Sequence, residues 1–311
     1  NLTVFYLAQI ILGFSAAAWL VSLKLILMKS KTDSHSRSFG WFYSMPHYAT
    51  AIAPVIGGLV IWKFGFTGVF LLSVAIQFAN AIYAYARLNG NLTKSQKQST
   101  ASQRRHSRMS PSKPNIRKNY SEILKIIKPD KTFIIIMFSI FLTLILVGIY
   151  RAFFVLFLQD LHFSQEEIIK FISLASIAYL PLSIMIIKII DKFKDAKIIS
   201  GGMTGEGLIT VTLGIFASVT NLVGMFFVMI ISSLSVLTME SGKSALLSKK
   251  LKKYQEEAST VDTVLTTLGP ALGALIGGIA ILYIGFQNTF LIAGVIVFVM
   301  GISSWFCKLK A

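Results

Sequence analysis

Long apolar runs alternate with short, lysine-rich polar breaks along most of the chain. A helix needs about 20 apolar residues to cross the roughly 30 Å hydrocarbon core of a bilayer. Segments that meet this requirement lie at residues 2–27, 40–62, 66–86, 132–158, 168–190, 198–218, 220–239, 260–284 and 287–307. The pattern therefore predicts an all-α polytopic membrane protein with nine visible transmembrane helices.

One polar interruption is much longer than the others. Residues 88–130 are rich in Ser, Gln, Asn, Lys and Arg, and they contain Pro111 and Pro114. Such a composition cannot bury enough apolar surface to pack a core. We therefore expect a flexible basic linker here, with one amphipathic stretch at residues 120–127.

The composition agrees with a lipid environment. Of the 311 residues, 54% are hydrophobic and 14% are charged, whereas soluble domains carry about 25% charged residues. These values exclude a soluble enzyme and a nucleic-acid-binding module. The expected surroundings are the lipid bilayer, with no nucleic-acid partner.

The net charge of +17 first indicates orientation in the membrane. If nine helices alternate in direction, all but three of the 30 Lys and Arg residues fall on one side, the exceptions being Lys63, Arg151 and Lys170. Basic loops face the cytosol in membrane proteins. We therefore expect the linker and the C-terminus to be cytosolic, and the protein to lie in the plasma (inner) membrane. Binding of anionic lipid headgroups by the linker is an alternative use of its charge.

An internal repeat relates the first three predicted helices to the last three. An ungapped offset of 220 residues gives seven identities in the sixteen positions 57–72, and it aligns Gly65 with Gly285. Three further helices before Asn1 would complete two six-helix halves, an architecture of transporters built from parallel repeats. We therefore expect residues 1–87 to be the last three helices of one half and residues 131–311 to be the other half.

Small residues follow one face of the second predicted helix and recur in the repeat. They are Gly40, Ala49, Ala53, Pro54, Gly57 and Gly58, and then Gly269, Pro270, Gly273, Gly277 and Gly278. The first set resembles the fifth-helix pattern of exporters and antiporters of the major facilitator superfamily (MFS). Small residues let helices approach closely, so an ordinary packing face is the alternative. The resemblance covers the whole chain and implies the MFS fold without its first three helices.

Two other motifs support this resemblance. The run from Gln9 to Gly13 is similar to a fourth-helix motif, with Gln9 where proton-coupled antiporters place Arg. Gln9 can hydrogen-bond a substrate or a neighbouring helix. The loop with Asp191, Lys192 and Lys197 resembles the charged loops that form cytosolic gates in the family. A solvated run of charge that ends two helices is the alternative.

Two ionisable residues are predicted near the middle of the membrane, where such groups are rare. Glu206 lies nine residues past Lys197, and His47 lies ten residues past Arg37, which places them about 13 and 15 Å deep. Glu206 is a candidate for proton transfer or gating, with a neutral, hydrogen-bonded structural role as the alternative. His47 is a candidate coupling residue because His titrates near neutral pH; a packed His bonded to a carbonyl is the alternative.

Arg151 is predicted near the outer edge of the membrane. It either extends to the interface or lines a cavity with Tyr150 and the neighbouring Phe153, Phe154 and Phe157. Such a wall suits an anionic or aromatic solute, although the aromatic residues also suit packing. Three acidic residues are predicted at cytosolic helix ends: Asp262, Glu240 and Asp191. They either form salt bridges of a gate or are charges exposed to solvent.

No enzyme motif competes with this interpretation. The chain has no phosphate-binding loop for ATP. Its four His residues and its single cysteine, Cys307, show no metal-ligand spacing. We expect no cofactor and no metal.

The sequence thus predicts a monomeric secondary active transporter that moves a small solute by alternating access. The expected partners are a small-molecule substrate and protons, with efflux driven by a proton or ion gradient. A non-transporting sensor or scaffold that is related to such transporters is the alternative. A polar cavity would favour transport, and a filled centre would favour the scaffold.

Overall fold

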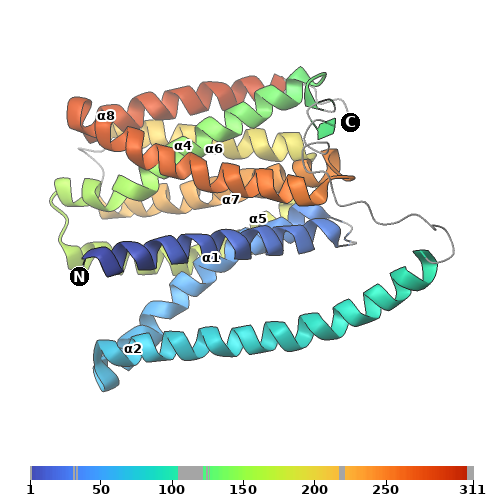
Figure 1. Ribbon diagram of the computed structural model, residues 1–311. Coiled ribbons are helices and arrows are strands. Elements are labelled where there is room, and N and C mark those ends of the chain that lie inside the picture. Colours follow the sequence, from blue (N-terminus) through green and yellow to red (C-terminus); the bar gives the residue numbers. More distant parts are fainter. Residues whose placement is uncertain are drawn as a thin grey trace. The chain divides into compact units, whose positions relative to one another are not determined.

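The computed structural model describes residues 2–30, 32, 34–103, 122–123, 125, 127–216 and 221–306. Within these residues every regular element is a helix, which confirms the all-α prediction (Figure 1). The helices are α1 (Leu2–Lys29), α2 (His35–Gln103), α4 (Lys131–Asp160), α5 (Gln165–Ile190), α6 (Asp195–Phe216), α7 (Leu222–Lys250) and α8 (Gln255–Phe306).

Two of these helices are interrupted by a glycine. Gly65 in α2 has φ 67° and ψ −175°, and Gly285 in α8 has φ 78° and ψ 171°. Glycine adopts positive φ without the steric cost that other residues incur. Each long helix is therefore a pair of helices, and the described residues hold nine helical segments, as predicted. Because Gly65 and Gly285 are 220 residues apart, the sequence repeat recurs in the backbone conformation.

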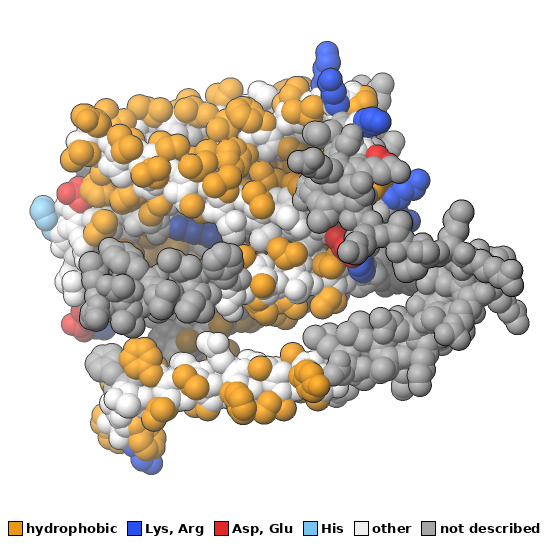
Figure 2. Space-filling view, in the orientation of Figure 1, with side chains coloured by type: hydrophobic (Ala, Val, Ile, Leu, Met, Phe, Trp, Pro, Cys, Tyr) orange, Lys and Arg blue, Asp and Glu red, His pale blue; other side chains and the backbone are white. Residues whose placement is uncertain are grey.

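Six described helices are long and apolar enough to cross a membrane by their length and composition. They are Thr67–Ala86, Lys131–Asp160, Gln165–Ile190, Asp195–Phe216, Val223–Lys250 and Gln255–Phe306. Hydrophobic side chains cover the exposed face of the helices in Figure 2. Leu282 and Phe306 of α8, for example, are 81% and 82% exposed. Such a surface is unfavourable in water and fits contact with lipid.

The chain forms two compact units. Residues 1–51 and 120–311 make one unit, and residues 52–119 make the other. In the second unit α2 remains helical as far as Gln103, well beyond residue 88 where the sequence predicted the linker to begin. Residues 88–103 contain no proline to end the helix. The central part of the predicted linker, residues 104–121, lies outside the described residues.

The predicted amphipathic stretch before α4 belongs to the first unit. Ile123 is buried in a core cluster, Ile127 packs against the same cluster, and Lys125 is exposed. Apolar side chains from α2, α4, α6 and α7 complete this cluster, among them Phe39, Phe133, Met203 and Met239. One face of this short segment is thus anchored to the helix bundle.

Glycines set the spacing of the helices in the first unit. A Cβ at Gly273 of α8 would collide with the carbonyl oxygen of Ile145 in α4. A Cβ at Gly202 of α6 would lie 2.6 Å from the backbone nitrogen of Met239 in α7. Side-chain-free positions let helix backbones approach closely in a membrane, where packing replaces the hydrophobic effect as the source of association.

We predict that Gly273→Ala will destabilise the protein by about 1–3 kcal/mol, because the added methyl group has no space. Gly201→Ala is the matched control, since the nearest atom to its Cβ would be Trp305 Cζ2 at 3.8 Å. Thermal unfolding of the detergent-solubilised variants measures the difference. Equal melting temperatures would show that α4 and α8 are not held at this spacing.

Candidate functional site

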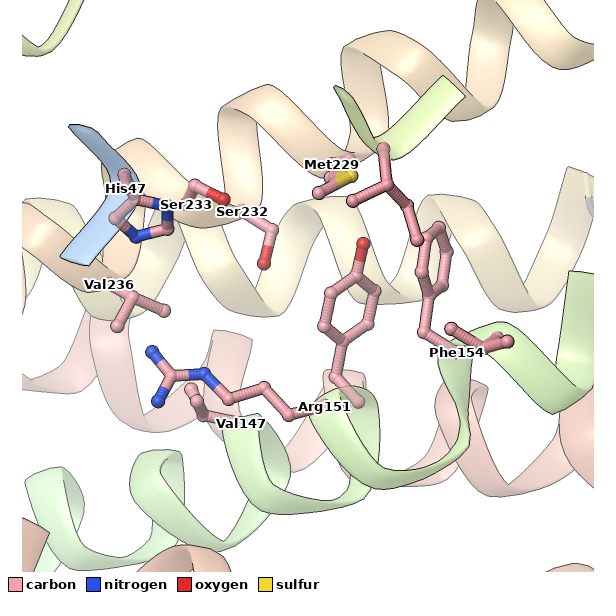
Figure 3. A pocket seen from close by; sticks show the side chains of 11 residues that line it. His47, Val147, Arg151, Phe154, Met229, Ser232, Ser233 and Val236 are labelled. Atoms are coloured by element: carbon pink, nitrogen blue, oxygen red, sulfur yellow. The ribbon is translucent and has the colours of Figure 1, made fainter. Parts of the chain in front are cut away.

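A pocket of about 220 Å³ lies among α2, α4, α5 and α7 within the first unit (Figure 3). Ligand pockets commonly measure about 300–1,000 Å³, so this one suits a small solute. Its lining combines a cation, an imidazole and hydroxyl groups with apolar side chains. The lining residues are His47, Val147, Tyr150, Arg151, Phe154, Val155, Ile172, Met229, Ser232, Ser233 and Val236.

The pocket brings His47 together with Tyr150 and Arg151, which the sequence analysis had proposed as one cavity wall. His47 comes from α2, whereas Tyr150 and Arg151 are adjacent in α4. The Arg151 guanidinium is close enough to His47 to interact with it electrostatically. Figure 3 shows both side chains at the same end of the pocket. Arg151 is exposed, and its guanidinium forms no hydrogen bond or ion pair with a described residue.

Aromatic side chains form one wall of the pocket. The rings of Tyr150 and Phe154 stack with their centroids 4.6 Å apart. The Tyr150 hydroxyl is buried and has no hydrogen-bond partner among the described residues. Phe157, which the sequence grouped with them, is instead fully buried, and its ring centroid lies 5.3 Å from that of Phe290. Of the four neighbouring aromatic residues, only Tyr150 and Phe154 therefore line the pocket.

Glu206 lies behind the pocket rather than in its lining. It is fully buried in α6, and its Oε1 accepts a 3.0 Å hydrogen bond from Ser232 Oγ. Ser232 lines the pocket, so one hydroxyl group links the carboxyl group to the cavity. The sequence analysis missed Ser232 and Ser233. The adjacent pair of serines in an otherwise apolar stretch of α7 was the available signal.

His47 also contacts a second aromatic residue. Its ring centroid lies 4.2 Å from that of Tyr179 in α5. The Tyr179 hydroxyl is buried without a hydrogen-bond partner among the described residues. This contact orients the imidazole at the edge of the pocket.

Apart from the pocket, the first unit contains a buried cluster of charged side chains between the ends of α1, α2, α7 and α8. Asp262 of α8 lies 3.1 Å from Lys24 Nζ of α1 and 3.0 Å from Lys243 Nζ of α7. All three side chains are fully buried. Thr266 Oγ1 accepts hydrogen bonds from both lysines, and the Tyr43 ring lies within 6 Å of both ammonium groups.

Two carboxyl groups balance the two lysines in this cluster. Glu240 of α7 is 5% exposed and acts electrostatically on Lys24. Ser244 donates a 2.7 Å hydrogen bond to Asp262, and Tyr43 donates one of 3.3 Å. A buried charge that has no partner of opposite sign strongly destabilises a protein. Asp262 is thus a buried salt-bridge residue rather than the solvated charge that was the alternative.

Further ion pairs, from exposed to half-buried, surround the cluster at the same end of the bundle, which we call the basic end. Lys29 pairs with Glu256 at 2.8 Å, Lys249 with Asp195 at 2.6 Å and Lys250 with Asp130 at 2.6 Å. These contacts join the connections before α2, α4, α6 and α8. The loops that the charge pattern assigned to one side of the membrane therefore lie together.

The loop with Asp191 contributes to the basic end. Asp191 accepts a hydrogen bond from Ser34 and lies 3.7 Å from Arg37, both at the start of α2. Asp195, which the sequence analysis did not single out, accepts a 2.8 Å hydrogen bond from Ser36. Lys192 and Lys197 are exposed and form no ion pair with a described residue. The acidic members of the loop thus make its contacts with α2.

Two titratable groups at the basic end have shifted pKa values. The Tyr254 hydroxyl donates to the Glu122 carboxylate, and this hydrogen bond raises the pKa of Tyr254. Burial lowers the pKa of His35, and the nearby Lys249 adds to this effect. Both shifts favour the uncharged forms of these side chains next to the ion pairs.

The two sets of small residues differ in what they contact. Gly269, Gly273 and Gly277 of α8 pack against Leu144, Ile145 and Ile149 of α4. A Cβ at Gly278 would lie 3.3 Å from Phe153, and Gly148 of α4 packs against the backbone of Pro270. Helices α4 and α8 therefore approach each other most closely along the second set of small residues.

The first set makes fewer contacts. A Cβ at Gly40 would lie 3.1 Å from Ile187 Cγ1 in α5, whereas one at Gly57 would meet nothing within 4 Å. Ala49 and Ala53 are exposed. The side chains of Gln9 and Pro54, and position 58, lie outside the residues whose side chains are described.

The fold and the pocket define a class of protein, an integral multi-pass membrane protein with a small pocket of mixed polar and apolar lining between its helices. The family model of the Major Facilitator Superfamily matches residues 1–261 and, in a second match, residues 136–310. The chain belongs to this superfamily and is a transporter of the major facilitator type. No curated protein matches the chain.

We predict that Asp262→Asn will open the basic end, because it leaves buried lysines without their carboxylate, at a cost of about 3–5 kcal/mol. Labelling by a water-soluble maleimide of Ser44→Cys, a fully buried position in α2, reports this opening once the single Cys307 is replaced by Ser. Labelling should become faster in Asp262→Asn.

The matched control is Lys29→Ala, which breaks an ion pair whose side chains are 50% and 71% exposed. Such pairs contribute less than about 1 kcal/mol, so labelling should stay at the original rate. If Asp262→Asn labels no faster than Lys29→Ala, the buried cluster does not hold the basic end closed.

Proposed function

We propose that the protein is a secondary active transporter that moves a small organic anion with an aromatic or apolar part by alternating access. The observation that carries this proposal is Arg151, a cation in the pocket with no described partner. Tyr150 and Phe154 supply an aromatic wall beside it. A pocket that polar side chains reach supports transport over a sensor or scaffold, for which a filled centre was expected.

The buried ion cluster is the gate in this proposal. Lys24 and Tyr43 come from the first half of the repeat, whereas Lys243 and Asp262 come from the second. With the basic end on the cytosolic side, the structure is closed toward the cytosol. Separation of the halves at this cluster would admit solute from that side.

The direction and the energy source are further parts of the proposal. The pattern at residues 40–58 resembles exporters, and efflux coupled to a proton or ion gradient is the direction that it favours. The buried carboxyl group behind the pocket favours uptake as the second candidate. Flux of solute measured in both directions across proteoliposomes, with and without an uncoupler, distinguishes the two. Transport unaffected by any ion gradient would count against coupling.

We predict that Arg151→Gln will weaken the binding of an anion such as benzoate by about ten- to a hundredfold, the worth of a charge-assisted hydrogen bond. Arg151→Lys should recover part of this affinity, because it keeps the charge but loses the planar fork of donors. Binding of radiolabelled benzoate to the purified full chain measures the effect, with benzylamine as the cationic comparison.

Lys170→Gln is the matched control. It removes an exposed cation from α5 that pairs with Glu166 on the same helix, and it should bind benzoate as the original protein does. A preference for benzylamine over benzoate would refute the anionic substrate class.

We predict that His47→Ala will abolish transport while the protein still inserts normally in the membrane. The imidazole lines the pocket and packs on Tyr179, so its loss changes both the lining and the orientation of this wall. His162→Asn, in the turn after α4, is the control, because Asn tolerates the positive φ of 67° at this position. Full transport by His47→Ala would remove His47 from the site.

A further inference from the structure

We infer that Glu206, with Ser232, forms a proton-binding site behind the pocket, and that its occupancy controls how tightly the pocket holds an anion at Arg151. The inference rests on the proposed function, because it assumes an anionic solute. It assigns the coupling ion and the sign of its effect on solute binding.

The hydrogen bonding of Glu206 is incomplete. The side chain is fully buried, Oε1 accepts one hydrogen bond from Ser232, and Oε2 has no partner among the described residues. A buried carboxylate with so few donors is unfavourable. Protonation removes the charge and turns the unpartnered oxygen into a donor. The Tyr150 hydroxyl is a second buried polar group without a described partner.

The helices pack closely on either side of Glu206 along α6. A Cβ at Gly205 would lie 2.5 Å from Ser235 Oγ of α7, and Gly207 packs directly on the backbone of Phe298 in α8. The helices on both sides of Glu206 are therefore in close contact. Ser232 is the described side chain that touches both the carboxyl group and the pocket.

Few charged groups act on Glu206 from the helices that pack against α6. From α4 these are Tyr150 and Arg151. The contacts from α7 come from Ser232 and Ser235, and α8 contributes Phe298 with neighbouring glycines, none of them titratable. His47 of α2 lies on the pocket beside Arg151. Arg151 is thus the cation shared by Glu206 and a bound anion.

This arrangement fixes the sign of the coupling. An ionised Glu206 competes with an anion for the field of Arg151 and holds the hydroxyl proton of Ser232. When Glu206 is protonated, the positive charge of Arg151 and the Ser232 hydroxyl donor are both free to interact with the solute. Because linkage is reciprocal, a bound anion in turn favours protonation of Glu206. Proton and anion therefore bind together, and an inward proton gradient drives uptake. Of the two proposed directions, the inference thus selects uptake, the second candidate, over efflux.

The first measurement tests the proton site without any solute. Infrared difference spectra of the purified full chain between about pH 6 and pH 8.5 should contain a protonated-carboxyl band. This band should vanish in Glu206→Gln and persist in Glu166→Gln, which alters an exposed carboxyl group of α5. A spectrum unchanged by Glu206→Gln would overturn the inference.

The second measurement tests coupling to the pocket. Benzoate, which is an anion throughout this range, should bind the original protein and Glu166→Gln about five- to tenfold more tightly at the lower pH, within the usual range of coupling between sites. Glu206→Gln mimics the protonated form, so it should bind tightly at both pH values. Equal pH dependence in Glu206→Gln, or export of benzoate in exchange for protons, would overturn the inference.

The two proposals fail in different ways. If Glu206 takes up a proton but benzoate binds at neither pH, the anionic substrate class of the proposed function is wrong and the inferred coupling to an anion falls with it. If benzoate binds through Arg151 but its affinity is the same with and without the Glu206 carboxyl group, the transporter proposal stands and the inference is wrong.

Discussion

The cost of leaving a charge unpaired in an apolar interior constrains how the helices of this protein meet. Lys24, Lys243 and Asp262 are all fully buried, and removing one partner from such a group leaves an uncompensated charge. The three residues come from α1, α7 and α8. These helix ends therefore have to meet at one point, and the other ion pairs of the basic end are arranged around it.

Arg151 differs from these charges because it is exposed and has no described ionic partner, and in the proposed function this difference separates a structural charge from a solute-binding one. The cluster at Asp262 satisfies its lysines with carboxylate, hydroxyl and aromatic groups. No described residue pairs with Arg151, although Glu206 acts on it from behind the pocket. A cation that must bind and release an anion cannot be held in a permanent ion pair. Glu206 can instead tune its field from a position that the solute does not occupy.

The sequence predicted the helices well because apolar length alone decides which segments can cross a bilayer. It also placed helix boundaries around Gly65 and Gly285, which occupy equivalent positions of the repeat, although it did not predict their positive φ. The end of α2 was harder to predict. Polar composition argued for a linker from residue 88, but Lys and Gln residues are also good helix formers, and α2 continues to Gln103.

The site was only partly predictable because distance along a helix gives depth but not direction. Depth identified His47 and Glu206, yet their different relations to the pocket depend on which face of each helix they occupy. Asp262 was placed at a helix end. Its burial depends on Lys24, which is far earlier in the chain, so no local pattern could reveal it. Ser232 was missed because a serine in a membrane helix usually bonds its own backbone.

The cluster at the basic end is built unevenly, and this matters for the proposal that it is a gate. Lys243, Ser244, Asp262 and Thr266 belong to α7 and α8, so they can keep their hydrogen bonds and ion pair if α1 and α2 move away. Lys24 and Tyr43 are the members that would leave. Asp262 would retain one lysine, and Lys24 would pass into water, where an ammonium group is well solvated. Opening therefore need not strand a buried carboxylate, and this makes a fully buried ion cluster compatible with repeated opening and closing.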